Sequence, residues 1–84
     1  MNNNTIPVMI DLGNDAHYDA NDILCVLPSN KRTSDDIRRK AKEDGRFFNF
    51  SGIAESKTLI LCKSGNVLLS CIDKKNILSS IEKL

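Results

Sequence analysis

The stretch Lys57-Thr58-Leu59-Ile60-Leu61-Cys62-Lys63-Ser64-Gly65-Asn66-Val67-Leu68-Leu69 decides the fold of this chain. It contains two apolar runs, residues 58–62 and 67–69, joined by a short polar turn that includes Gly65. Two β-forming runs joined in this way are typical of a β-hairpin. Both runs are apolar at successive positions, so each strand is expected to be covered on both faces.

The chain is short for a sheet that must be covered twice. It has 84 residues, and a domain of this size buries only roughly 60–65% of its unfolded surface. We expect one domain over residues 1–84, with residues 1–4 loose. Few other elements are available to cover the hairpin, so we predict that a helix covers one side and a second subunit the other. Homo-oligomerisation is therefore the leading expectation.

Four further segments have strand patterns. Residues 6–12 alternate, with Ile6, Val8, Ile10 and Leu12 toward one face, and turn-forming residues follow them. The other expected strands are residues 16–18, residues 23–27 and residues 46–51, of which the last holds three phenylalanines for one strongly apolar face. With the hairpin they predict a small, mainly antiparallel sheet of four to five strands.

A central basic helix is expected between this sheet's third strand and the phenylalanine-rich segment. Thr33 or Ser34 can cap it, and Gly45 can end it after about Asp44. Its apolar stripe is thin, and most of its surface is basic.

A short C-terminal helix over residues 74–83 completes an α+β fold. Asp73 is the expected N-cap. Ile77, Leu78 and Ile81 form its expected buried stripe.

Composition excludes several functional classes. Hydrophobic residues make up 40% and charged residues 27%, with a net charge of +1, which is an ordinary globular balance. A nucleic-acid binder of this size often has a basic excess, so such a role must come from a local patch or from a patch repeated around an oligomer. No apolar run is long enough to span a bilayer and no secretory signal is visible, which predicts a cytoplasmic protein without membrane contact.

Catalytic and metal sites are not expected. The three cysteines are odd in number and lack C-x-x-C spacing, so we interpret them as buried free thiols in a reducing compartment. His17 is the only histidine and has no partner nucleophile, which indicates a surface or edge-strand residue. We therefore predict no enzyme, no cofactor, no metal and no small-molecule substrate.

The order of elements and several short motifs resemble the RemA/RemB family of small bacterial extracellular-matrix regulatory proteins. The resemblance covers almost everything from Ile10 to about Ile81. Residues 10–15 followed by Asp22-Ile23 are similar to RemB in type and spacing. Ala20-Asn21, Pro28 and residues 41–45 are similar to RemA, and both share the hairpin with Ser70 after its second strand.

The resemblance implies a compact α+β domain that assembles into closed higher oligomers. For RemA it also implies DNA binding through arginines displayed repeatedly around the assembly. The positions of those family arginines fall here on Asn21, Asp22, Ala54 and Glu55. The resemblance therefore supports fold and assembly more strongly than it supports DNA contact.

The candidate phosphate contacts are cations of the polar connection before the central helix, of that helix, and of the loop before the hairpin: Lys31, Arg32, Arg38, Arg39 and Lys57. Such a cluster can clamp phosphates. It can also be a solvated helix face with charge pairs from Asp35 to Arg39 and from Asp36 to Lys40, at i and i+4.

Two functional hypotheses follow. In the first, the protein is an oligomeric regulator that binds double-stranded DNA with tolerance for sequence, through many weak basic patches acting together. In the second, it is an oligomeric adaptor or structural protein that has the family's fold without its DNA role. Acidic residues at the family's arginine positions favour the second.

Overall fold

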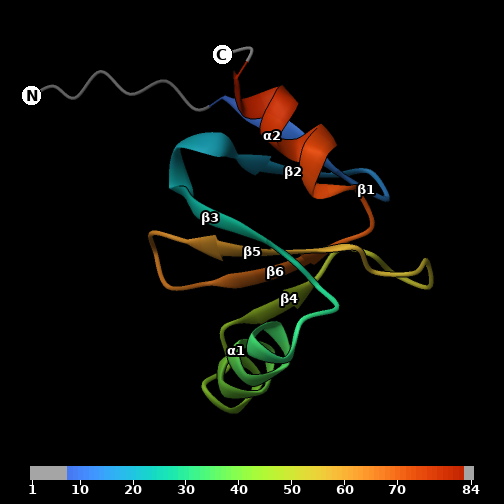
Figure 1. The fold of residues 1–84 in the computed structure, drawn as a ribbon. Coiled ribbons are helices and arrows are strands. Elements are labelled where there is room, and N and C mark those ends of the chain that lie inside the picture. The colour runs from blue at the N-terminus through green and yellow to red at the C-terminus, as the bar shows by residue number, and fades with distance from the viewer. Residues whose placement is uncertain (1–7, 83–84) are drawn as a thin grey trace, which may run out of the picture.

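The computed structural model describes residues 8–82 and has a four-stranded sheet, a separate β-hairpin and two helices (Figure 1). The larger sheet has the order β3-β5-β6-β4, with β3 at Ile23–Pro28, β4 at Phe47–Asn49, β5 at Thr58–Cys62 and β6 at Val67–Ser70. The hairpin pairs β1, Met9–Gly13, with β2, Ala16–Asp19, and a 3-10 turn η1, Ala20–Asp22, leads from β2 into β3. The helices are α1, Arg32–Glu43, and α2, Lys74–Glu82.

The predicted hairpin forms the centre of the larger sheet. Strands β5 and β6 are antiparallel, with Leu59 opposite Leu69 and Leu61 opposite Val67. Strand β3 adds to β5 in the antiparallel sense, whereas β4 lies parallel to β6. The α+β class, the mainly antiparallel sheet, the central helix and the short C-terminal helix are thus confirmed.

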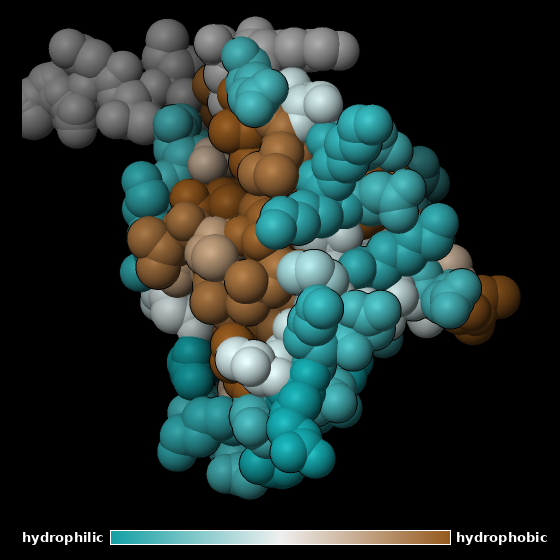
Figure 2. Space-filling view, viewed as in Figure 1, coloured by the Kyte–Doolittle hydropathy of each residue, from teal (hydrophilic) through white to brown (hydrophobic). Residues whose placement is uncertain are grey.

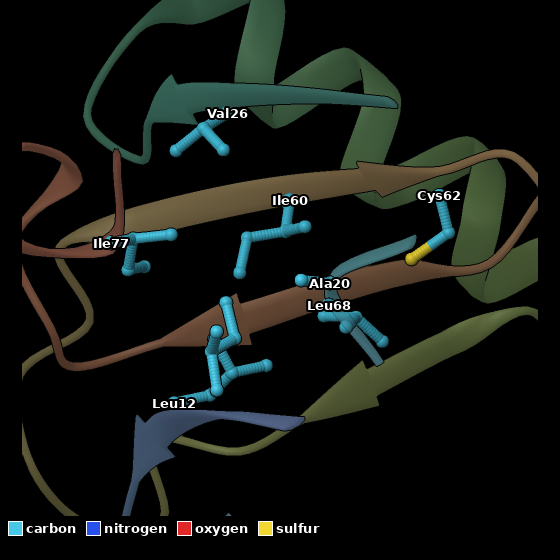
Figure 3. Close-up of a cluster of buried hydrophobic side chains, with 8 residues drawn as sticks. Leu12, Ala20, Val26, Ile60, Cys62, Leu68 and Ile77 are labelled. Carbon is cyan, nitrogen blue, oxygen red and sulfur yellow. The ribbon is translucent and has the colours of Figure 1, made fainter. Parts of the chain in front are cut away.

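One face of the sheet packs against the β1–β2 hairpin and α2. Ile60 and Leu68 of the sheet are fully buried there against Leu12 of β1 and Ile77 of α2, and these side chains point toward one another in Figure 3. The alternation predicted for the first strand holds in its described part, because Ile10 and Leu12 are buried while Met9 and Asp11 are exposed. Ile6 lies outside the described residues.

The other face of the sheet packs against α1. Leu59, Val67 and Leu69 are buried there together with Ala41 of α1, and Ile37 packs beside them. The thin stripe expected for this helix is therefore sufficient to cover the centre of the sheet.

The single chain supplies the cover that we expected from a second subunit. Leu59, Ile60 and Leu68 each have 0% of their surface exposed without any partner. The prediction that a second subunit covers one side of the β5–β6 hairpin is therefore wrong, because the β1–β2 hairpin and α2 cover that side. Self-assembly remains a prediction, and it must use some other surface.

Buried hydroxyl groups connect the layers. The Ser70 hydroxyl donates a hydrogen bond to the Leu12 carbonyl at 2.6 Å, and the Thr58 hydroxyl donates to the Ile72 carbonyl at 2.6 Å. The first bond attaches β1 to the larger sheet and the second fixes the segment before α2. At the same junction Gly13 has φ +92°, and a Cβ there would lie 2.6 Å from the Cys71 sulfur. Only glycine fits this contact.

Helix α1 begins two to three residues earlier than expected. Lys31 is the N-cap residue, and its side chain makes no capping hydrogen bond. Ser34 instead points inward, where its hydroxyl donates to the Pro28 carbonyl at 2.6 Å. The predicted cap at Thr33 or Ser34 is wrong because this inward bond satisfies the serine inside the helix's first turn. The predicted stop holds, since Asp44 is the C-cap and Gly45 has φ +73°.

Two predicted apolar faces also differ from the structure. The three phenylalanines of β4 and the residue after it have different surroundings: Phe47 packs toward α1, Phe50 packs toward the opposite core, and Phe48 is 44% exposed. In α2, Leu78 is 37% exposed, while Ile77 is buried.

Shortening Leu68 to alanine tests the internal cover. We expect Leu68→Ala to lower the free energy of unfolding by about 2–5 kcal/mol, because it leaves a cavity in a fully buried site. Leu78→Ala, a matched change on α2, should cost less than about 1 kcal/mol. Urea unfolding followed by circular dichroism measures both, and equal losses would contradict the packing described here.

Candidate nucleic-acid interface

Two polar segments lie side by side where β3 ends and β5 begins. The Ser29 amide donates a hydrogen bond to the Lys57 carbonyl at 3.1 Å, and the Ser29 hydroxyl donates to the Ser56 carbonyl at 3.1 Å. These bonds join the entry to α1 with the loop that precedes the hairpin. A pocket of about 370 Å³ opens here, lined by Pro28, Ser29, Asn30, Glu55, Ser56, Lys57, Asp73 and Lys74.

Lys31 and Arg32 stand at the N-terminus of α1, next to this pocket in the chain. Both are exposed, and neither makes an ion pair within residues 8–82. The first N–H groups of a helix have no intrahelical acceptor and carry the positive end of its dipole. Of the five candidate cations, these two are therefore the ones best placed to meet an anion.

Arg38 and Arg39 are already paired with carboxylates. An Arg38 nitrogen lies 2.5 Å from an Asp35 oxygen, and an Arg39 nitrogen lies 3.0 Å from an Asp36 oxygen. The predicted i,i+4 pairs are wrong, because both arginines reach back only three residues. Lys40 likewise pairs with Asp44 at 3.8 Å instead of with Asp36. These neighbours reduce the positive potential of the helix face.

Lys57 also faces a carboxylate. Its ammonium nitrogen lies 3.7 Å from an Asp73 oxygen across the pocket, and about half of its side chain remains exposed. Pairs of this kind at a surface contribute little stability, so Lys57 can exchange partners at small cost. The exposed Glu55 on the same loop opposes an incoming phosphate.

The family's arginine positions lie at opposite ends of the sheet. Ala54 and Glu55 are exposed in the loop before β5, whereas Asn21 and Asp22 belong to η1, beside the turn after β5. Figure 1 shows this loop and this turn at the two ends of the β5–β6 hairpin. One chain alone does not bring the two sets together.

Asp22 holds the β1–β2 layer against the β5–β6 turn. Its carboxylate accepts hydrogen bonds from the Tyr18 hydroxyl at 2.5 Å, the Ser64 hydroxyl at 2.7 Å and the Ser64 amide at 3.0 Å. The Tyr18 and Ser64 donors lower the pKa of Asp22, while burial and the bond to Asp22 raise the pKa of Tyr18 to about 12. Sequence reasoning missed this structural role, because Asp22 and Ser64 are 42 residues apart.

The reactive side chains form no constellation in the described part of the chain. His17 is exposed on β2, as expected. Cys62 is buried, and burial raises the pKa of its thiol, whereas Cys25 and Cys71 are half-buried; all three are free. No group of three or more possible metal-ligating side chains occurs within residues 8–82.

Comparison with known proteins gives a match to one family model. The model described as extracellular matrix regulatory protein A-like covers residues 9–81, nearly the whole chain. The chain belongs to the RemA-like family. This description supports a regulatory role connected with the extracellular matrix. A search of curated proteins found no match. Among residues 8–82, neither helix has the length and apolar character needed to cross a bilayer.

The hydrogen bonds of Asp22 predict a pH-dependent stability. We expect Asp22→Asn to lower the free energy of unfolding by about 1 kcal/mol at neutral pH, because it removes charge-assisted hydrogen bonds at a partly exposed site. A carboxyl whose folded pKa is lowered stabilises the fold above its unfolded pKa of about 3.9, and the effect is lost as pH falls through the folded value. The difference between wild type and variant should therefore be full near pH 7 and shrink below about pH 4.

Urea unfolding at several pH values measures this difference. Asp15→Asn is the control, since Asp15 is exposed in the β1–β2 turn and makes no hydrogen bond or ion pair among the described residues. A constant difference between wild type and Asp22→Asn down to pH 2 would contradict the assignment.

Proposed function

We propose that this RemA-like protein is an oligomeric bacterial regulator that binds the phosphate backbone of double-stranded DNA. The observation that carries the proposal is the placement of Lys31 and Arg32. Both are exposed cations without a carboxylate partner among the described residues, at the N-terminus of α1. Phosphate oxygens bind at such helix ends, where they accept hydrogen bonds from side chains and from backbone N–H groups.

Repetition supplies the affinity that one subunit lacks. The chain has a net charge of +1, and three of the five candidate cations already face carboxylates. Each subunit then offers about two strong phosphate contacts, which bind DNA weakly on their own. Several copies held in one rigid assembly add their contacts, because each later contact forms at a high effective concentration.

The same geometry explains tolerance for DNA sequence. Contacts to phosphate fix the position of a protein on the duplex but carry no base information. Lys31 and Arg32 reach outward from a helix end, and the pocket beside them is lined by short polar and charged side chains. This surface suits a contact with the DNA backbone.

A second function, that of an oligomeric adaptor without DNA binding, is favoured by a specific observation. Asp22 and Glu55 place negative charge at two of the family's arginine positions, and Asp22 is engaged in three hydrogen bonds that hold the fold together. This carboxylate serves packing and would repel a phosphate near it.

Removing the two unpaired cations tests the first function. The double variant Lys31→Ala/Arg32→Ala should bind a duplex at least about tenfold more weakly at low salt, and the dependence of affinity on salt should flatten by about 0.9 in slope for each phosphate that the variant no longer neutralises. A mobility-shift assay across a salt series measures both. Lys40→Ala/Lys75→Ala removes the same charge elsewhere and should have a smaller effect.

The wild-type protein decides between the two functions. If it fails to bind DNA even at low salt, the adaptor function stands and the DNA function is rejected. In that case Ala54→Arg/Glu55→Arg, placed on the exposed loop, should create binding. Asp22 is unsuitable for such a replacement, because arginine there would remove the hydrogen bonds to Tyr18 and Ser64.

A further inference from the structure

Three segments that are far apart in the sequence form the pocket near the start of α1. Residues 28–30 come from the end of β3, residues 55–57 precede β5, and residues 73–74 stand at the start of α2. The volume of about 370 Å³ falls within the roughly 300–1,000 Å³ typical of sites for small molecules. Figure 2 shows hydrophilic residues gathered between α2 and the loop that joins β4 to β5, on this side of the molecule. The pocket therefore suits a small polar ligand.

Hydrogen bonds hold the three segments of the pocket in place. The Ser29 amide and the Ser29 hydroxyl donate to the carbonyls of Lys57 and Ser56, respectively. The buried Thr58 hydroxyl donates to the carbonyl of Ile72, just before α2, at 2.6 Å. A ligand that enters the pocket therefore meets walls that are already positioned, which lowers the entropic cost of binding.

Two lysines of the pocket are available to an anion. Lys74 is exposed and makes no ion pair within residues 8–82. Lys57 has Asp73 as its partner at 3.7 Å, and the two side chains are 51% and 57% exposed, so the pair is weak. A phosphomonoester carries a charge of about −1.5 to −2 at neutral pH, and lysine ammonium groups bind it through charge-assisted hydrogen bonds. The two lysines therefore match the terminal phosphate of a small molecule.

Two carboxylates of the same pocket select the rest of the ligand. Glu55 is exposed and has no ion pair or hydrogen bond in the described part of the chain. Asp73 is released when a phosphate takes its place beside Lys57. Ionised carboxylates only accept hydrogen bonds, so they repel a second phosphate and favour a group rich in hydroxyl donors. Asp and Glu bind the hydroxyls of ribose in this way in dinucleotide sites.

We propose that this pocket binds the ribose phosphate of a free ribonucleotide. Lys57 and Lys74 hold the terminal phosphate, and Glu55 accepts hydrogen bonds from the vicinal hydroxyls of the ribose. Asp73 holds Lys57 in position before the ligand enters. The DNA backbone does not match this site, because each of its phosphates carries a single charge and deoxyribose lacks one of the two hydroxyls.

Four small molecules test the two halves of the ligand, with binding measured by isothermal titration calorimetry in the absence of DNA. Uridine monophosphate should bind about three- to tenfold more tightly than deoxyuridine monophosphate, which has one ribose hydroxyl fewer to donate to Glu55. Uridine has no phosphate and inorganic phosphate has no ribose, so each should bind more weakly than the complete nucleotide.

Four variants assign the roles of the side chains. Lys74→Ala should weaken the binding of uridine monophosphate by about three- to tenfold. Lys75→Ala, the matched change of the next lysine, should leave it unchanged, because Lys75 is exposed outside the pocket. Glu55→Ala should abolish the preference for uridine monophosphate over deoxyuridine monophosphate, whereas Glu43→Ala, at an exposed glutamate of α1, should retain it. Circular dichroism checks that each variant is folded.

Several results would overturn the proposal. Equal affinity of the wild type for the two nucleotides would show that the ribose is not recognised, and inorganic phosphate bound as tightly as the nucleotide would leave only a phosphate site. Equal losses in Lys74→Ala and Lys75→Ala would indicate a general effect of charge. A short oligouridine that binds more tightly than uridine monophosphate at physiological salt would identify RNA as the ligand instead.

The absence of any binding would reject the pocket as a ligand site. At about 5 mM uridine monophosphate, a site with a Kd of about 1 mM would be mostly filled, so no heat of binding at this concentration contradicts the proposal. Lys31 and Arg32 do not line the pocket and stay intact in every variant. The outcome is therefore independent of the proposed DNA binding, and the failure of either proposal leaves the other standing.

Discussion

Burial of the β5–β6 hairpin on both faces is the constraint on which the whole structure depends. Leu59, Ile60 and Leu68 are excluded from water within a chain of 84 residues. This requires two covering layers, and the chain supplies them from its two ends and its middle. The N-terminal hairpin joins α2 on one face, and α1 covers the other. Most of the helices and strands are needed to bury this hairpin, so the candidate functional groups lie at helix ends and in loops.

The candidate interface is built from a helix end and a loop, because the other elements are used to cover the sheet. Cations sit at the start of α1 and in the loop before β5, where two connections are tied together by Ser29. Carboxylates of α1 pair with Arg38 and Arg39, and Asp73, just before α2, pairs with Lys57. A single chain is left with a small positive site at the start of α1. In the proposed function DNA binding therefore depends on assembly, because only several copies together offer many phosphate contacts.

Local patterns in the sequence were sufficient to predict the hairpin, both helices and the fold class. The continuous apolar runs within residues 58–69 and the alternation at Ile10 and Leu12 are properties of neighbouring residues, and propensity rules describe them well. The covering role of the β1–β2 hairpin depends on contacts between distant segments, which no local pattern carries. The exposure of Phe48 and Leu78 is likewise a matter of tertiary packing, which local patterns do not predict.

The candidate site was predictable to a similar depth. The sequence identified Lys31 and Arg32 as candidate phosphate contacts. The choice between i,i+3 and i,i+4 ion pairs at Arg38 and Arg39, however, depends on side-chain rotamers. The role of Asp22 was beyond sequence reasoning, because its partner Ser64 lies in a different part of the chain. A residue at a family binding position can thus serve packing instead.

The hydrogen bond from Ser70 to Leu12 joins residues 58 positions apart, and it has a consequence for biosynthesis. The N-terminal hairpin has no sheet to rest on until β5 and β6 have left the ribosome, and Ile77 completes that core only when α2 has emerged. Non-local pairing of this kind slows folding and leaves apolar strands exposed in the meantime. Strand β1 of the nascent protein is therefore unprotected until α2 has been synthesised.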